Sequence, residues 1–184
     1  MALTPSTMIP LGTLCPPFSL EEVTTKAIVA PSDFRASPLL VMFICNHCPF
    51  VVHVQEELAR LTTEYSARGV GIVGICSNDS ATYLDDAPPK MVQMARKNRW
   101  GFPYLHDATQ EVARAFDAAC TPDFFLFDRS HRLVYRGQLD ESRPGNHQPV
   151  TGSDLRGALD AVLAGTSVAA DQRPSLGCNI KWKQ

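Results

Sequence analysis

The stretch "LLVMFICNHCPFVVHVQEELARLTTEY", residues 39–65, joins two patterns that predict different secondary structure. Residues 39–45 form a continuous apolar run, which is typical of a strand buried on both faces. From Val51 to Tyr65, apolar side chains recur at steps of three and four, which predicts the buried stripe of a helix that Gly69 ends. The stretch therefore predicts a C-x-x-C motif at the junction of a strand and a helix.

This motif, Cys45 to Cys48, can be a redox couple, half of a metal site, or two cysteines of the core. A thiolate attacks and a thiol does not, and free cysteine has a pKa near about 8.5. Unpaired backbone N–H groups and the helix dipole lower the pKa of a cysteine at a helix N-terminus. Pro49 suits a first helical turn, and a protonated His47 would add a positive charge. The position favours a reactive Cys48, whereas His47 could equally be a surface histidine without a role.

Composition limits the class of protein. The chain has 184 residues, 45% apolar and 20% charged, with a net charge of −2. It is expected to form one domain, and its charge gives no reason to expect nucleic acid or an anionic membrane as partner. The first twenty residues lack Lys and Arg and contain four prolines, which is unlike a secretory signal, and no run approaches the roughly 18 apolar residues of a membrane span. Six cysteines are too sparse for a disulfide scaffold, so a cytoplasmic protein without a cofactor is expected.

Strand and helix patterns alternate along the rest of the chain. The expected elements are a hairpin within 18–35, a strand at 70–76, a polar loop at 78–89 leading into a helix to 98, a strand at 102–105, a helix at 109–118, a hairpin around the turn 128–131, a loop at 138–152 and a helix from an N-cap at Ser153 to 164. Strand, helix and strand with short links predict a right-handed parallel crossover. The single domain 1–184 would comprise an extension with a hairpin (1–35), a core (36–165) and a tail without periodicity (166–184).

This order of elements resembles the thioredoxin fold, an α/β architecture with a central mixed sheet flanked by helices. Residues 39–65 resemble the active-site strand and helix of thioredoxins, and "CTPDFFLFD" (120–128) resembles the segment with their cis-proline. "CNHCP", "TPDFFLFD" and the terminal "GCNIKWK" are similar to the peroxiredoxin-like, AhpC/TSA-related redoxins that are sometimes labelled thiol-disulfide isomerases. The likeness covers nearly the whole chain and implies thiol-disulfide exchange.

Alignment with thioredoxin implies individual roles. When Phe43 and Tyr65 lie on the equivalent aromatic residues, no gap is needed and Cys48 takes the nucleophile's place. The buried acid of thioredoxins is then replaced by Met42, so another base or water must take the proton of the resolving thiol. Peroxiredoxins carry their peroxide-attacking cysteine where this chain has Val51. The resemblance therefore implies weak peroxidase activity.

Thr121 and Pro122 are the second element that the resemblance assigns. A cis Pro122 would turn the backbone of Thr121 toward Cys48, where it could pair with an extended substrate. The alternative is an ordinary trans proline at the start of an edge strand.

The resolving thiol has three candidates. Cys45 can bridge to Cys48 if Asn46 and His47 turn tightly, because a disulfide needs Cα atoms about 4.4–6.8 Å apart. If the strand continues instead, Cys120 is the nearer thiol. Cys178 becomes a third candidate if the tail folds back over the site; it could equally be a free thiol on a disordered end.

The predicted function is that of a thiol-disulfide oxidoreductase. Cys48 attacks a substrate disulfide, a mixed disulfide forms, and a second thiol, Cys45 in the first instance, releases the product. The expected partners are a disulfide-containing protein or small thiol substrate and a cellular thiol reductant. The alternatives are a peroxiredoxin-like peroxidase, or a protein that binds copper with Cys45, His47 and Cys48 plus His147 or Cys120. The lack of a second paired motif is unlike an ordinary zinc site.

Overall fold

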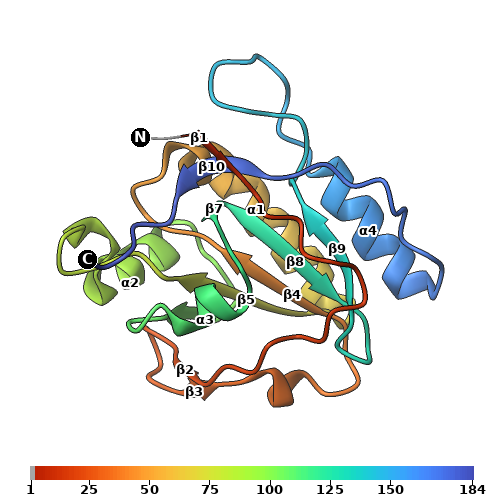
Figure 1. The fold of residues 1–184 in the computed structure, drawn as a ribbon, viewed down its shortest axis with the longest axis horizontal. Coiled ribbons are helices and arrows are strands. Elements are labelled where there is room, and N and C mark those ends of the chain that lie inside the picture. The colour runs from red at the N-terminus through yellow and green to blue at the C-terminus, as the bar shows by residue number, and fades with distance from the viewer. Residues whose placement is uncertain (1–2) are drawn as a thin grey trace.

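The computed structural model describes residues 3–184, and its centre is a five-stranded mixed sheet. Its strands are β4 (Leu39–Phe43), β5 (Gly71–Cys76), β6 (Tyr104–His106), β8 (Asp123–Phe127) and β9 (Leu133–Gly137). They lie in the order β6-β5-β4-β8-β9 (Figure 1). β4, β5 and β6 are parallel, whereas β8 is antiparallel to β4 and to β9. The predicted parallel crossover, the hairpin and the mixed thioredoxin-like sheet are therefore confirmed.

Helices cover both faces of this sheet, as the continuous apolar run of β4 requires. One face packs against α1 (Pro49–Ala67), α2 (Pro88–Lys97) and α4 (Ser153–Ala164). The other face packs against α3 (Glu111–Ala115) and the N-terminal segment that carries β2 (Leu20–Glu21), β3 (Ile28–Val29) and the 3-10 helix η1 (Pro31–Phe34). Side chains alternate along a strand, so Leu40 and Met42 face α1 while Val41 and Phe43 face Phe116. All five side chains of β4 are fully buried.

The helix α1 confirms the predicted apolar stripe and fixes the position of the motif. Its buried apolar residues are Val51, Val54, Leu58, Leu61 and Tyr65. Gly69, which has a φ of +89°, lies just beyond its C-terminus. Pro49 is the first helical residue, and Cys48 is the N-cap with extended backbone. The second cysteine of the motif therefore lies at the helix N-terminus.

Three predicted boundaries were wrong. The strand expected over 39–45 ends at Phe43, because the N–H of Asn46 bonds to the carboxylate of Asp86 instead of continuing the sheet. The helix expected over 109–118 is shorter and comprises only Glu111–Ala115 (α3). It cannot continue to residue 118 because Asp117 takes a φ of +51°. Ser153 is the first residue of α4 rather than its N-cap; the cap is Gly152, at a φ of +69°.

The tail was expected to be aperiodic, and this was wrong for its last part. β10 (Leu176–Asn179) pairs antiparallel with β1 (Leu3–Pro5) on one side and with β7 (Cys120–Thr121) on the other (Figure 1). Strands of two to four residues are too short to show a hydrophobic period, which is why the sequence pattern missed them. Ile180 follows β10 and is 1% exposed, so an apolar side chain anchors the end of the chain.

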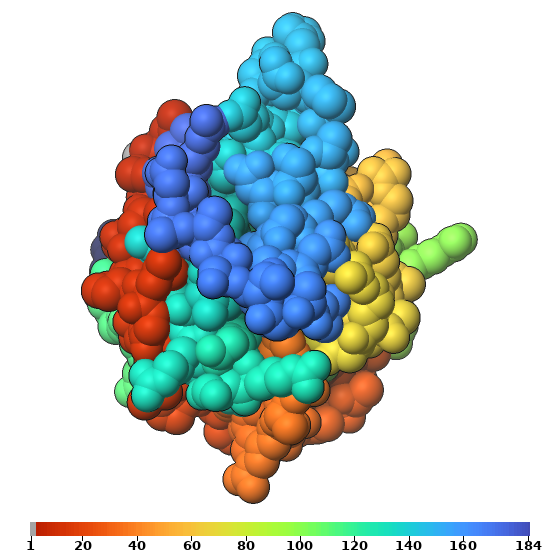
Figure 2. All heavy atoms as spheres, turned by 90° about the vertical axis from the view of Figure 1, so that its right-hand side faces the viewer, coloured from red at the N-terminus to blue at the C-terminus, as the bar shows by residue number. Residues whose placement is uncertain are grey.

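The remaining connections are long. The loop of residues 138–152 between β9 and α4 projects beyond the rest of the molecule (Figures 1 and 2). The polar loop after β5 contains the 3-10 helix η2 (Leu84–Asp86), and α2 follows it directly. Within residues 3–184, no helix has the length and the apolar character that crossing a bilayer requires.

Candidate active site

The two sulfurs of the C-x-x-C motif meet the segment before Pro122. Cys48 Sγ lies 3.1 Å from the carbonyl oxygen of Thr121, and Cys45 Sγ lies 3.4 Å from the Thr121 hydroxyl. The Thr121–Pro122 peptide is cis, as predicted. Cys48 is 0% and Cys45 is 1% exposed, so both thiols lie beneath the surface. The structure thus brings together Cys45, Cys48, Thr121 and Pro122.

The surroundings of Cys48 favour its thiolate. A hydrogen bond from Cys45 is the largest cause that lowers the pKa of Cys48, to about 5. Burial opposes this shift, whereas Cys178, Thr121 and the backbone N–H of Val51 add to it. The carbonyl oxygen of Thr121 can only accept, and it favours the protonated thiol. One acceptor stands against several donors at a helix N-terminus, so the thiolate is the favoured state.

The other five cysteines of the chain differ from Cys48 in this respect. The same hydrogen bond, followed by burial, raises the pKa of Cys45 well above its usual range. Burial raises the pKa of Cys15 to about 12, and burial together with Cys48 raises that of Cys178 to about 12. Burial also raises the pKa values of Cys76 and Cys120. Cys48 is therefore the one acidic thiol among the six.

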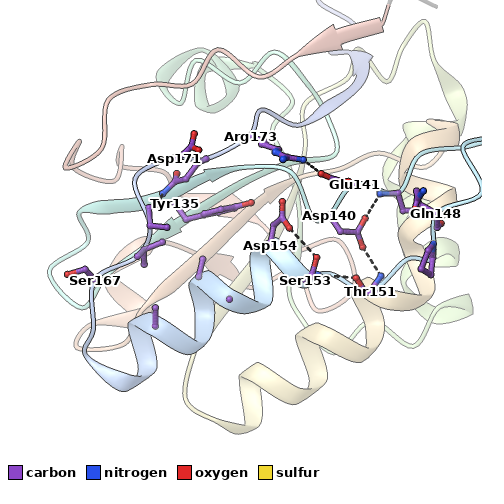
Figure 3. A pocket seen from close by; sticks show the side chains of 18 residues that line it. Tyr135, Asp140, Glu141, Gln148, Thr151, Ser153, Asp154, Ser167, Asp171 and Arg173 are labelled. Atoms are coloured by element: carbon purple, nitrogen blue, oxygen red, sulfur yellow. Dashed lines mark hydrogen bonds and ion pairs between the residues drawn. The ribbon is translucent and has the colours of Figure 1, made fainter.

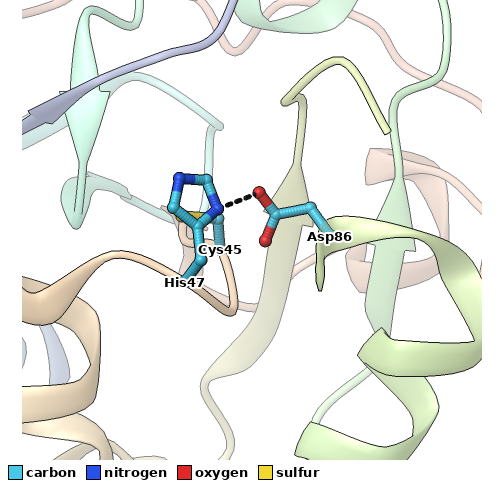
Figure 4. Close-up of side chains that lie close together, drawn as sticks. All are labelled: Cys45, His47 and Asp86. Carbon is cyan, nitrogen blue, oxygen red and sulfur yellow. Dashed lines mark hydrogen bonds and ion pairs between the residues drawn. The ribbon is translucent and has the colours of Figure 1, made fainter. Parts of the chain in front are cut away.

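His47 is held by a buried carboxylate that the sequence did not reveal. Its Nδ1 donates to Asp86 Oδ2 at 2.6 Å, and this hydrogen bond is the main reason that the pKa of His47 is raised (Figure 4). Asp86 is fully buried and also accepts from the Asn46 N–H and the Asn78 side chain, each at 2.7 Å. Burial raises the pKa of Asp86, but these hydrogen bonds outweigh it and the net shift is downward. Each member of the pair therefore favours the charged form of the other.

This pair lies beside the first cysteine of the motif. Cys45, His47 and Asp86 each offer one potential metal-ligand atom, and these three atoms lie within 4.8 Å of one another (Figure 4). Met42, which the likeness to thioredoxins aligns with their buried acid, is fully buried in the apolar core. A carboxylate from η2 thus lies near Cys45 where β4 supplies none. The only signal in the sequence was the acidic pair Asp85–Asp86 at the end of a polar loop.

The same cluster is the group that could hold a metal ion. The predicted copper ligands were Cys45, His47 and Cys48, but the cluster contains Asp86 and not Cys48. Within residues 3–184, neither His147 nor Cys120 belongs to such a cluster. Both carboxylate oxygens of Asp86 already accept hydrogen bonds. A metal ion would have to displace some of these donors.

The remaining thiols that the sequence singled out lie on the two strands beside Pro122. Cys120 and Thr121 form β7, and Cys178 lies on β10 in register with Thr121. Cys120 is buried, with its Sγ 3.7 Å from the Pro122 carbonyl oxygen. The tail therefore folds back over the site, as one of the two alternatives for Cys178 required.

A large hollow lies away from the thiols. A cavity of about 730 Å³ lies between α4, the end of β9 and residues 167–173 (Figure 3). It is lined mainly by polar and acidic side chains, among them Asp140, Glu141, Asp154 and Asp171, and by no cysteine. A smaller hollow of about 310 Å³ lies beside His47, against Tyr83 and Leu84. The Tyr83 ring stacks on His47 at 5.4 Å.

Comparisons with known proteins bear on the family and the fold of the chain. The sequence model of the AhpC/TSA family matches residues 11–136. An uncharacterized conserved protein from Geobacillus kaustophilus is 53% identical, with 100% of this chain and 97% of that chain covered and a TM-score of 0.97. A hypothetical protein from Sinorhizobium meliloti 1021 is 47% identical, with 98% of each chain covered and a TM-score of 0.95.

A more distant similarity concerns the fold alone. A putative thiol:disulfide interchange protein DsbE from Chlorobium tepidum is 18% identical, with 84% of this chain and 98% of that chain covered and a TM-score of 0.66. A search of curated proteins found no match.

Proposed function

The chain belongs to the AhpC/TSA family, and on this premise we propose that it is a thiol-disulfide oxidoreductase with Cys48 as its nucleophile. One observation carries the proposal: Cys48 alone combines a lowered pKa, a helix N-terminus and contact with the segment before a cis-proline. A low pKa supplies thiolate at neutral pH, which thiol-disulfide exchange requires. Thr121 and Pro122 are the proposed substrate-binding residues.

The proposed reaction has two exchange steps. The Cys48 thiolate attacks one sulfur of the substrate disulfide, that S–S bond breaks, and the leaving thiolate takes up a proton. Cys45 then loses its proton and attacks Cys48 Sγ, which releases the second substrate thiol and forms the Cys45–Cys48 disulfide. In the mixed disulfide Cys48 is no longer a thiolate, so the hydrogen bond that raises the pKa of Cys45 is lost. Cys45 therefore becomes the better nucleophile when it is needed.

His47 and Asp86 are proposed to manage the protons of this cycle. Asp86 lies near Cys45 and carries a negative charge, while His47 can give a proton to a leaving thiolate. Together they would take the role of the buried acid of thioredoxins, for which this chain has Met42. An external thiol reductant of the cell would return the Cys45–Cys48 disulfide to two thiols.

The proposed substrates are disulfide-containing proteins or small thiol compounds, and the cytoplasm is the proposed place of action. No bound cofactor takes part in the scheme. Peroxidase chemistry is assigned a minor role, because Val51 lies where peroxiredoxins carry their peroxide-attacking sulfur.

Reduction of insulin in the presence of dithiothreitol tests the proposal. The wild-type protein should accelerate precipitation of the insulin chains, and Cys48→Ser should lose this acceleration. Cys15→Ser is the matched control, because Cys15 lies in the N-terminal segment and has no place in the site. Equal activity of Cys48→Ser and the wild type would contradict the proposal.

Metal binding is the second candidate function, and the Cys45, His47 and Asp86 cluster is the observation that favours it. Metal analysis of protein purified without a chelator tests it. Stoichiometric metal that Asp86→Asn removes, together with no insulin reduction by the wild type, would place metal binding first.

A further inference from the structure

The strand β10 occupies the edge that a substrate would use. Cys178 pairs with Thr121 and Asn179 with Cys120, and the N–H of Ile180 bonds to the Ala119 carbonyl oxygen at 3.1 Å. Extended peptides bind by adding a strand to such an edge. The tail therefore lies on the segment before Pro122 as a bound peptide would, with a cysteine opposite Thr121.

This register brings a third sulfur to the nucleophile. The carbonyl oxygen of Thr121 is 3.1 Å from Cys48 Sγ, and Cys178 is the residue paired with Thr121. A hydrogen bond joins the two thiols: it lowers the pKa of Cys48 and, after burial, raises that of Cys178. Cys178 is 3% exposed, so its side chain is buried.

The docking of β10 is close and specific. A Cβ at Gly177 would lie 2.0 Å from the Thr121 carbonyl oxygen, so only glycine allows the two backbones to approach this closely. Beyond the strand, the Lys181 N–H donates to Asn78 Oδ1 at 2.8 Å, and the Lys181 carbonyl oxygen accepts from Asp79 N–H at 2.8 Å. The thiol of Cys178 is thus held in place before any reaction, which favours an intramolecular step.

We propose that Cys178 is a third redox thiol of this site, which exchanges with the Cys45–Cys48 disulfide to form a Cys48–Cys178 disulfide. The inference rests on the proposed function, because it needs Cys48 to carry a disulfide. The Cys178 thiolate attacks Cys48 Sγ, the Cys45–Cys48 bond breaks, and Cys45 leaves as a thiolate that takes up the proton lost by Cys178. No electrons are gained or lost, so no further oxidant is required.

Disulfide mapping tests this exchange. Each variant is treated with glutathione disulfide, alkylated and digested without reduction, and the linked peptides are identified by mass spectrometry. A sample of oxidised wild type should yield both linked peptides, Cys45–Cys48 from some molecules and Cys48–Cys178 from others. Cys45→Ser should retain the Cys48–Cys178 peptide, and Cys178→Ser should retain only the Cys45–Cys48 peptide. Cys120→Ser, a buried neighbour on β7, is the matched control and should retain both.

The variant Gly177→Val tests whether the Cys48–Cys178 bridge requires β10 to be docked on β7. Its side chain would collide with the backbone of Thr121, so the Cys48–Cys178 peptide should be lost while the Cys45–Cys48 peptide remains. A Cys45→Ser protein whose Cys48 becomes glutathionylated but never bridges to Cys178 would overturn the inference and leave the proposed function intact. A Cys48 that exchanges with glutathione disulfide in no variant would overturn both.

Discussion

Two regions of the molecule differ in the way that matters for function: the open cavity against α4 and the closed thiol site at the N-terminus of α1. The cavity has a volume of about 730 Å³ and polar walls, yet it contains no cysteine (Figure 3). The thiol site leaves Cys48 with no exposed surface, yet the pKa of Cys48 is lowered to about 5. Large pockets are the usual first place to look for a ligand site. Here the proposed nucleophile is recognised by the groups that it contacts and not by the size of a pocket around it.

Two carboxylates of the cavity already have structural partners. Asp140 Oδ2 accepts the N–H groups of Thr151 and Gly152, which positions the start of α4. Asp154 Oδ2 accepts from the Gln138 side chain at 2.7 Å. These carboxylates hold the projecting loop and the helix together. In the thiol site, by contrast, the hydrogen bonds converge on one sulfur.

Of all changes in the two regions, replacement of the proposed nucleophile should lower the activity most. Cys48→Ser should lower the rate of disulfide reduction by more than about a thousandfold, because covalent catalysis leaves little activity once its nucleophile is gone. Steady-state insulin reduction measures the effect. A Cys48→Ser protein that keeps a tenth or more of the activity, as a rough threshold, would assign the reaction elsewhere.

The next largest difference is expected between the alkylation rates of Cys48 and the other thiols, because the pKa of Cys48 is low. Since its pKa is lowered to about 5, Cys48 should be a thiolate from that pH upward, and its alkylation rate should level off well below pH 9. Cys15 is the most exposed thiol, but its pKa is raised to about 12, so it should react only at high pH. Limiting iodoacetamide followed by peptide mapping measures both rates. Preferential labelling of Cys45 near neutral pH would overturn the assignment of the nucleophile.

Changes to the His47–Asp86 pair beside Cys45 should have a smaller effect on turnover. Asp86→Asn removes the main cause of the raised pKa of His47, so His47 should titrate at a lower pH, which NMR of its ring protons can follow. With Asp86 present, the extra stability of protonated His47 is complete below its unfolded pKa and is lost as the pH rises through the folded pKa. Turnover should fall by up to about a hundredfold.

Asp85→Asn is the matched control for this variant, because its side chain takes no part in the hydrogen bonds of His47. An Asp86→Asn protein with an unchanged His47 titration would show that the pair does not set the charge of the ring.

The sequence was sufficient for those parts of the molecule that depend on local pattern. The apolar period of α1 placed Cys48 at a helix N-terminus, and the likeness of residues 120–128 to thioredoxins placed the cis Pro122. Asp86 was missed because its contact with His47 joins residues 39 positions apart, across a polar loop without period. β10 was missed because a four-residue strand carries no period, and its place depends on pairing with two strands that are distant in sequence, β1 and β7.

Peroxide consumption should be close to background. Val51 is fully buried and apolar in the first turn of α1, and the likeness to peroxiredoxins aligns it with their attacking cysteine. A thioredoxin-coupled peroxidase assay, with a known peroxiredoxin as positive control, measures this rate. Turnover comparable to that control would place peroxidase activity ahead of disulfide exchange.

The smallest effect is expected in the cavity, and a glycine there can be compared directly with a glycine of β10. Gly157 lies in the interior of α4 and lines the cavity, and a Cβ there would meet no atom within 4 Å. Gly157→Ala should therefore raise the free energy of unfolding by about 0.5–1 kcal/mol, since alanine loses less backbone entropy than glycine in a helix. Denaturant unfolding of the reduced protein measures this gain, and insulin reduction should stay unchanged. Gly177→Val, whose side chain has no room beside Thr121, should by contrast destabilise the protein and weaken the pairing of β10 with β7. If Gly157→Ala lowered the rate of disulfide reduction, the cavity would be part of the working site and the distinction between the two regions would fail.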